Sequence, residues 1–128
     1  MPDRPRSVDH LLPLKPKVLH ILLALADGPR HGYSIMQEVA ARTDGQMRVW
    51  PAAMYGTLRD LEERDLIVES DKRPSPDDER RRYFGLTPLG KRVLNREVQR
   101  LEAIVDLARA SRALRPSTAL RAGKPGRA

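Results

Sequence analysis

The sequence contains no cysteine. This absence excludes disulfide bonds, zinc sites with thiolate ligands and cysteine nucleophiles. Long hydrophobic stretches are also missing, because the longest apolar run, Ile21 to Ala26, is far too short to span a bilayer. The first ten residues lack the apolar segment of a signal peptide. We therefore expect a cytoplasmic protein with no membrane partner.

Residue sets that carry catalysis or hold a cofactor are absent as well. The histidines, His10, His20 and His31, have no ligand-like spacing, and His20 is interpreted as a core or surface residue. No Ser/His/Asp set is evident, and "DGPRHG" lacks the spacing of a glycine-rich phosphate loop. We expect no enzyme, no catalytic residues, no metal site and no cofactor.

Positive charge, in contrast, is in excess. Twenty-four lysines and arginines face 17 aspartates and glutamates, which gives a formal net charge of +7. This excess favours a polyanionic partner, with nucleic acid as the first expectation and an anionic membrane surface as the second. The 128 residues, 40% of them hydrophobic, suffice for one domain with a modest core.

The chain is expected to divide into four parts. Residues 1–13 hold three prolines, and residues 115–128 hold four basic residues and no acidic ones, so both are interpreted as tails. Residues 14–86 are expected to form one folded domain, and residues 87–114 a long helix.

Hydrophobic periodicity predicts two helices at the start of the domain. Apolar residues recur at helical spacing from Val18 to Ala26, and "DGP" must end that helix. A second helix fits His31 to Thr43, with Ile35, Met36 and Val39 on its buried face.

The third predicted helix has an unusual front. Met47 to Trp50 is expected to form a short strand before it, and Pro51, which lacks an N–H, suits its first position. Met54, Leu58 and Leu61 make its buried face. The other side carries small or hydrogen-bonding residues: Ala52, Ala53, Tyr55, Gly56 and Arg59. Such a side can approach a flat surface closely; a solvated helix with an accidental glycine is the alternative.

Two strands are predicted next. Leu66 to Asp71 and Arg80 to Leu86 are joined by a polar, proline-containing loop, which indicates a hairpin with a long tip. Period-two alternation puts Phe84 and Leu86 on the core side and Tyr83 on the other. The arginines therefore project from a ribbon whose base is anchored in the core.

The last predicted helix carries a narrow apolar seam. Thr87 can cap it, and Pro88 suits its first position. The seam steps alternately by four and three residues, as in a coiled coil. Its members are Leu94, Val98, Leu101, Val105 and Ala108, widened by Ile104 and Leu107. The helix either folds back on its own domain or pairs with a second copy of the chain, and we expect the homodimer.

The order of these elements is that of a winged helix-turn-helix domain, mainly α with a small β-hairpin, followed by a long C-terminal dimerisation helix. Three segments make the likeness specific: "LALADGPRHGYSI" (Leu23 to Ile35), "MYGTLRDLEERDLI" (Met54 to Ile67) and "RRRYFGLTPLG" (Arg80 to Gly90). Over roughly residues 14–110 the chain resembles the PadR family of bacterial transcriptional regulators. The resemblance implies a dimeric DNA-binding repressor.

The chain departs from the family pattern at a few positions. Asp65 stands where the family has a glycine, and because aspartate tolerates the left-handed conformation, the turn is expected to survive. Phe84 replaces a common tyrosine, and Gly85 a common basic residue. Trp50 is expected to pack beside the third helix.

On this reading, the helix that begins at Pro51 enters the major groove by its N-terminal end. Tyr55 and Arg59 are expected to reach base edges or phosphates, and the basic residues around them to position the protein on phosphates. Tyr33 either offers its hydroxyl to the DNA backbone or packs on the third helix. The expected DNA-binding residues are Tyr33, Arg48, Pro51, Ala52, Ala53, Tyr55, Gly56, Arg59, Lys72, Arg73, Arg80 and Arg81.

Two other functions stay open. A winged helix can serve as a protein–protein contact inside a larger assembly. A nonspecific basic nucleic-acid or membrane-surface binder would rely on residues 115–128. The sequence names no operator and no regulated gene, and it leaves a small-molecule effector open.

Overall fold

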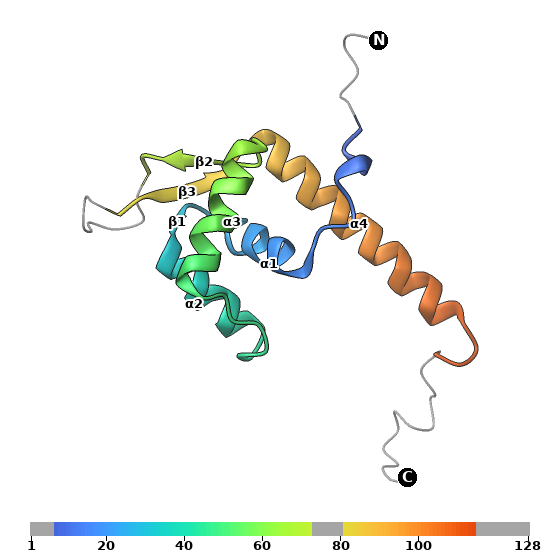
Figure 1. The fold of residues 1–128 in the computed structure, drawn as a ribbon. Helices are drawn as coiled ribbons and strands as arrows, with labels where there is room; N and C mark the ends of the chain where they lie inside the picture. The colour runs from blue at the N-terminus through green and yellow to red at the C-terminus, as the bar shows by residue number, and fades with distance from the viewer. Residues whose placement is uncertain (1–6, 73–80, 115–128) are drawn as a thin grey trace. The chain divides into compact units, whose positions relative to one another are not determined.

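The computed structural model describes residues 7–72 and 81–114, and the chain splits into two units, residues 1–97 and 98–128. Figure 1 shows the helices and strands of the described residues. In chain order they are a 3-10 helix η1 (Asp9–Leu11), α1 (Pro16–Ala24), β1 (Arg30–His31), α2 (Gly32–Arg42), α3 (Pro51–Glu63), β2 (Ile67–Ser70), β3 (Tyr83–Leu86) and α4 (Pro88–Ala110). The predicted fold, a mainly helical winged helix-turn-helix domain followed by a long helix, is confirmed.

The small sheet is antiparallel, with the strand order β1-β3-β2. β2 and β3 form the predicted hairpin. The strand predicted at Met47 to Trp50 is wrong, because these residues have no regular structure. The third strand is β1, in which Arg30 pairs with Phe84 and His31 with Tyr83. An extended segment becomes a strand only where it meets a partner edge, and the turn before α2 lies at that edge.

Two consecutive aromatic residues of β3 are buried, which simple alternation does not allow. Tyr83 and Phe84 are each 2% exposed, whereas the sequence pattern puts Tyr83 on the solvent side. The ring of His31 in β1 meets Tyr83 edge-on, with 5.2 Å between the ring centroids. The added strand therefore supplies cover for Tyr83 that a two-stranded hairpin would lack.

The predicted buried faces of α2 and α3 are confirmed. Both helices contribute to one core together with α1, β3 and the start of α4. The fully buried side chains on the two helices are Ile35, Val39, Met54, Leu58 and Leu61, and Met36 packs partly against them. This burial fixes which side of α3 faces outward.

The turn after α3 and the start of α4 are tied together. Asp65 adopts the expected left-handed conformation, with a φ of 62°. The Thr87 hydroxyl accepts a hydrogen bond from the backbone N–H of Gly90 at 2.9 Å, as predicted for a cap, and donates one to the carbonyl of Asp65 at 2.6 Å. Gly90 has to be glycine, because a β-carbon there would collide with the carbonyl oxygen of Leu66.

The first part of α4 belongs to the first unit. Val93 and Leu94 are buried in its core, and the 1% exposed Glu97 accepts a hydrogen bond from the backbone N–H of Leu14 at 2.9 Å. Leu94 is therefore a core residue of its own chain, whereas the sequence pattern places it on the dimer seam. The apolar residues of α4 follow the same spacing along its whole length. The spacing therefore does not show which of them pack in the core of their own chain and which stay exposed.

The second unit begins at Val98 and includes the rest of α4. Its apolar side chains are mostly exposed: Val98, Ile104, Val105 and Leu107 are exposed, and Leu101 and Ala108 are half-buried. Among the described helices, α4 included, there is none with the length and apolarity needed to cross a membrane.

Candidate nucleic-acid interface

α3 presents the front that the sequence predicts. Pro51 lies in its first turn, and the buried residues hold its other side in the core. The six predicted contact residues on this helix are all exposed: Pro51, Ala52, Ala53, Tyr55, Gly56 and Arg59. A β-carbon at Gly56 would have no neighbour within 4 Å among the described atoms. The first turn carries no acidic residue, so the positive end of the helix dipole is not offset there.

Two tyrosines stand where α2 begins. Tyr55 lies so close to Gly32, the first residue of α2, that a β-carbon on Gly32 would come within 2.8 Å of the phenol oxygen. Tyr33 is 54% exposed, so it is not the buried tyrosine of the alternative reading. His31 caps α2 by accepting a hydrogen bond at Nδ1 from the backbone N–H of Ser34, at 3.1 Å. This cap stabilises the start of α2, next to Tyr33.

The hairpin of β2 and β3 is the wing of the domain. The two described arginines that directly precede β3 have different surroundings. Arg82 is bound within the fold, since its guanidinium lies 3.1 Å from a Glu62 carboxylate oxygen of α3 and 3.0 Å from one of Glu69 in β2. The hydrogen bond to Glu69 is the main cause that raises the pKa of Arg82 above its usual value. Arg81 is exposed, with its guanidinium 2.9 Å from Nε2 of His31. Arg82 thus anchors the wing, while Arg81 faces outward.

Four further basic residues are predicted contacts. Arg48, in the segment before α3, and Lys72, after β2, are exposed. Arg73 and Arg80 lie outside the described residues.

Two clefts that share Tyr33 join half of the predicted contact residues that the structure describes. The other half line neither cleft: Ala52, Ala53, Gly56, Arg59 and Lys72. One cleft, of about 320 Å³, is lined by Tyr33, Tyr55 and Arg81 among others. The other, of about 440 Å³, is lined by Tyr33, Arg48, Trp50 and Pro51 among others. Side chains from α2, α3, the segment before α3 and the wing therefore form one continuous surface. We call the six residues named as lining these clefts the contact surface.

Trp50 differs most from its prediction. Trp50 is predicted to pack beside α3, yet it is 70% exposed. It occupies the position immediately before the helix, where Ser, Thr, Asp and Asn are preferred because they can cap the N–H groups. A tryptophan directly before Pro51 is unusual, and this is the feature of the sequence that indicates Trp50 as a candidate contact residue.

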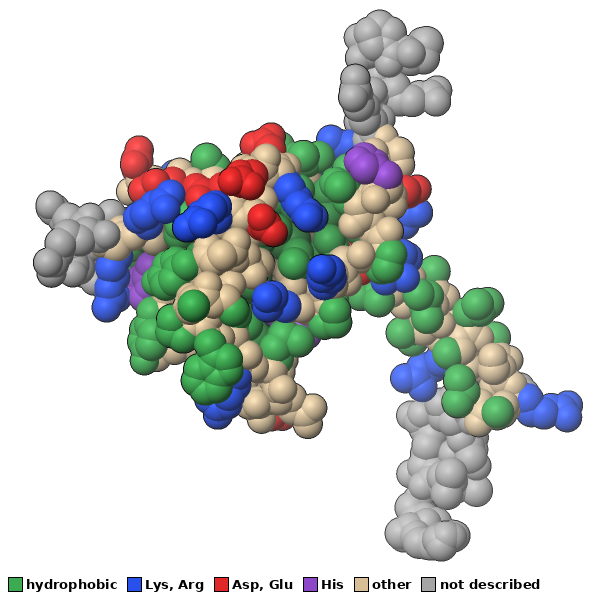
Figure 2. Space-filling model, in the orientation of Figure 1, with side chains coloured by type: hydrophobic (Ala, Val, Ile, Leu, Met, Phe, Trp, Pro, Cys, Tyr) green, Lys and Arg blue, Asp and Glu red, His purple; other side chains and the backbone are tan. Residues whose placement is uncertain are grey.

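Charge is unevenly distributed along α3. Figure 2 shows that acidic side chains, interspersed with basic ones, gather over β2 and the C-terminal end of the helix, and that hydrophobic ones lie over α2 and the start of α3. Acidic groups repel a polyanion. The distribution therefore favours the N-terminal end of α3 as the end that meets one.

Comparison with known proteins identifies the family. A model of the transcriptional regulator PadR-like family matches residues 21–96. The chain belongs to this PadR-like family. It is therefore a transcriptional regulator, and the family resemblance predicted from the sequence is confirmed.

The chain is also similar to individual known proteins. The chain is 42% identical over 77 residues to an uncharacterized 37.1 kDa protein in transposon TN4556 of Streptomyces fradiae, a match over 60% of this chain that spans only 20% of that protein. It is 30% identical over 90 residues to an uncharacterized protein X of Lysinibacillus sphaericus, covering 68% of this chain and 82% of the relative. A PadR family transcription regulator from Clostridium difficile R20291 has a similar fold, with a TM-score of 0.57, 24% identity and coverage of 72% and 95% of the two chains.

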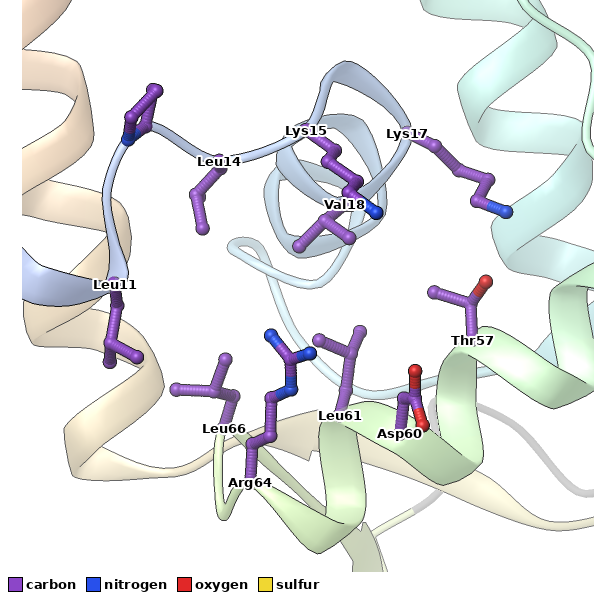
Figure 3. Close-up of a pocket in the computed structure, with 11 residues that line it drawn as sticks. Leu11, Leu14, Lys15, Lys17, Val18, Thr57, Asp60, Leu61, Arg64 and Leu66 are labelled. Carbon is purple, nitrogen blue, oxygen red and sulfur yellow. The ribbon is translucent and has the colours of Figure 1, made fainter.

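This PadR-like chain has a third cleft, of about 230 Å³, between α3 and the segment that leads into α1 (Figure 3). Its floor is aliphatic, and Figure 3 shows Lys15 and Arg64 pointing into it. Its other lining residues include Leu14, Val18 and Leu61. No predicted DNA-binding residue lines this cleft. Across residues 7–72 and 81–114 there is no group of three potential metal-ligating side chains.

Proposed function

We propose that this PadR-like regulator is a repressor that binds a pseudo-palindromic DNA operator as a homodimer. The observation that carries the proposal is the contact surface, in which two clefts sharing Tyr33 join residues of α2, α3 and the wing. In winged and simple helix-turn-helix domains, these are the elements that meet DNA.

α3 would enter the major groove by its N-terminal end. Ala52, Ala53 and Gly56 are small and exposed, so the helix can approach closely. Tyr55 and Arg59 would reach base edges, where an arginine can bond guanine through two hydrogen bonds. The exposed basic residues around the helix would bind phosphates, which fix register without reading sequence. The exposed ones are Arg48, Lys72 and Arg81. Arg73 and Arg80, outside the described residues, are further predicted phosphate contacts.

The homodimer would form along α4. Val98, Ile104 and Val105 expose apolar surface on this helix, and burying such surface against a second copy stabilises association. Leu101 and Ala108 lie on the same seam, whereas Leu94 is already used in the core. A two-fold dimer presents α3 twice, and half-sites are then expected about one helical turn apart, roughly 34–36 Å, or a multiple of that.

The remaining expectations stay predictions. On this proposal the protein is not an enzyme, needs no cofactor or metal, does not bind membranes and acts in the cytoplasm. A small-molecule effector is left open, and the cleft beside Arg64 is one place with room for a ligand next to α3.

Selection of bound DNA from a random pool with the purified full chain tests the proposal. The expected result is an enriched pseudo-palindrome with half-sites related by two-fold symmetry. A chain without residues 115–128 should enrich the same sequence, because the contact surface lies elsewhere.

The two alternative functions give other outcomes. A protein-interaction module would enrich no sequence and would bind random DNA weakly. A nonspecific basic binder would retain DNA without sequence preference and would lose it when residues 115–128 are removed. Either outcome would overturn the proposal.

A further inference from the structure

We infer that Trp50 makes the N-terminal end of α3 a reader of thymine methyl groups. The inference deepens the proposed DNA-binding function and rests on it. It assigns a role in sequence specificity to Trp50, because the fold does not explain why a tryptophan stands at this position.

Trp50 breaks two local rules at once. It occupies the N-cap of α3 with extended backbone angles, φ −79° and ψ 155°, and within the described residues no side chain caps this helix end. A Ser, Thr, Asp or Asn there would satisfy an N–H that tryptophan leaves unbonded. The same residue leaves 70% of its surface in water, although its large, mostly apolar ring system is usually buried for the most part. Rule-breaking without a structural gain is expected where a residue serves function.

The residues after Trp50 show what chemistry this helix end offers. Pro51, Ala52 and Ala53 are all exposed and have no hydrogen-bonding side chain. The next residue, Met54, is buried, so the first polar side chain on the exposed side is Tyr55. The leading turn therefore cannot read a base by the side-chain hydrogen bonds that Arg, Asn or Gln make.

An apolar surface in the major groove has one specific partner. Of the groups that base pairs display there, only the C5 methyl of thymine is apolar, and it is read by van der Waals contact. Arg48 lines the same cleft as Trp50 and is exposed. A phosphate contact by Arg48 would hold the indole at the edge of the groove. Trp50 with the small residues behind it thus fits a thymine in each half-site.

Replacing thymine by deoxyuridine in the operator tests this inference, because it removes the methyl group and leaves base pairing unchanged. The operator is the one selected by the full wild-type chain, with single replacements made symmetrically in both half-sites. Wild type should lose about fourfold in affinity per methyl group at one thymine or more of each half-site. Trp50→Ala should bind the thymine and deoxyuridine operators equally well.

Two further variants separate reading from folding. Trp50→Ser supplies a capping hydroxyl, so it should unfold at a higher urea concentration than wild type and still show no thymine preference. Trp50→Phe keeps an aromatic ring and should retain part of the preference.

The outcomes that oppose the inference are distinct from one another. Equal wild-type affinity for both operators would overturn it while leaving the proposed function intact. Equal discrimination by wild type and Trp50→Ala would show that another residue reads the methyl group. If the wild-type chain selects no operator at all, the proposed function fails and the inference falls with it.

Discussion

The phenol ring of Tyr55 occupies the space in which a side chain on Gly32 would stand, since a β-carbon there would lie 2.8 Å from its hydroxyl oxygen. Gly32 begins α2 and Tyr55 belongs to α3, so the absence of one side chain sets the position of the other. The two helices of the contact surface are coupled through this pair.

Replacing Gly32 with alanine should therefore weaken DNA binding without unfolding the protein. The atoms that a β-carbon at Gly32 would meet belong to the end of the Tyr55 side chain, which can move aside. The displaced phenol would lose its proposed hydrogen bond to DNA, which is worth about 1 kcal/mol. Affinity for the selected operator, measured for Gly32→Ala, Tyr55→Ala and the double variant, checks this. The double variant should bind no worse than Tyr55→Ala; fully additive losses would contradict the coupling.

Local rules were enough to predict several parts of this molecule. The face of α3 follows from the spacing of Met54, Leu58 and Leu61, and the cap at Thr87 follows from residue type and position. Both features depend on interactions within a few residues along the chain. Such local interactions can be predicted directly from residue type and spacing.

The features that could not be predicted from the sequence depend on contacts between residues far apart in the chain. β1 is two residues long and exists only because β3 offers it an edge. The burial of Tyr83 follows from that pairing and could not be predicted without it. Leu94 and Val98 both belong to the apolar seam of α4, but Leu94 packs in the core whereas Val98 does not. Trp50 is of a residue type that commonly packs in a core, yet 70% of its surface is exposed.

Replacing Arg81 with alanine should affect DNA binding, whereas replacing Arg82 should affect stability. Arg81→Ala removes a predicted phosphate contact, so the slope of log K against log salt should shrink by roughly one per lost contact on operator and random DNA alike. Arg82→Ala is the matched control. Its charge is already balanced by Glu62 and Glu69, so it should leave the slope unchanged and lower the unfolding free energy by about 0.2–1 kcal/mol. Equal salt slopes for wild type and Arg81→Ala would remove Arg81 from the phosphate contacts.

Arg59 should carry sequence preference. Arg59→Ala is an exposed substitution, so the unfolding free energy should change by no more than about 0.5 kcal/mol. Affinity for the operator should fall by about 1–3 kcal/mol, with a much smaller loss on random DNA. Arg64→Ala, near the end of the same helix, serves as the control and should keep the preference. Repeating the selection with each variant checks both, and an unchanged motif for Arg59→Ala would make Arg59 a phosphate contact.

The dimer proposal can be tested on α4. Val105→Asp would bury an unpaired carboxylate in each copy and should cost several kcal/mol per dimer, so sedimentation should show monomers where wild type is dimeric. Gln99→Asp introduces the same carboxylate at an exposed polar position of this helix and should leave the dimer intact. Dimers that persist in Val105→Asp would place the association elsewhere.

Thr87 should contribute strongly to stability for its size. Thr87→Ala removes the hydroxyl that caps Gly90 and binds the carbonyl of Asp65, and we expect a loss of about 1–2 kcal/mol in the unfolding free energy. Thr87→Ser keeps the hydroxyl and should lose much less. Urea unfolding of the three proteins provides the comparison, and equal midpoints for Thr87→Ala and wild type would contradict the assigned cap.

The close approach of Gly90 to the Leu66 carbonyl also decides how hybrid regulators could be assembled. A C-terminal helix taken from a relative and joined at Thr87 would bring its own residue to position 90, and any residue but glycine would push that helix away from the start of the wing. A grafted helix would also need a residue at position 97 that accepts the hydrogen bond from the backbone N–H of Leu14, as Glu97 does. The two parts of this protein can therefore be exchanged independently only at a junction after Glu97, where the helix has left the core.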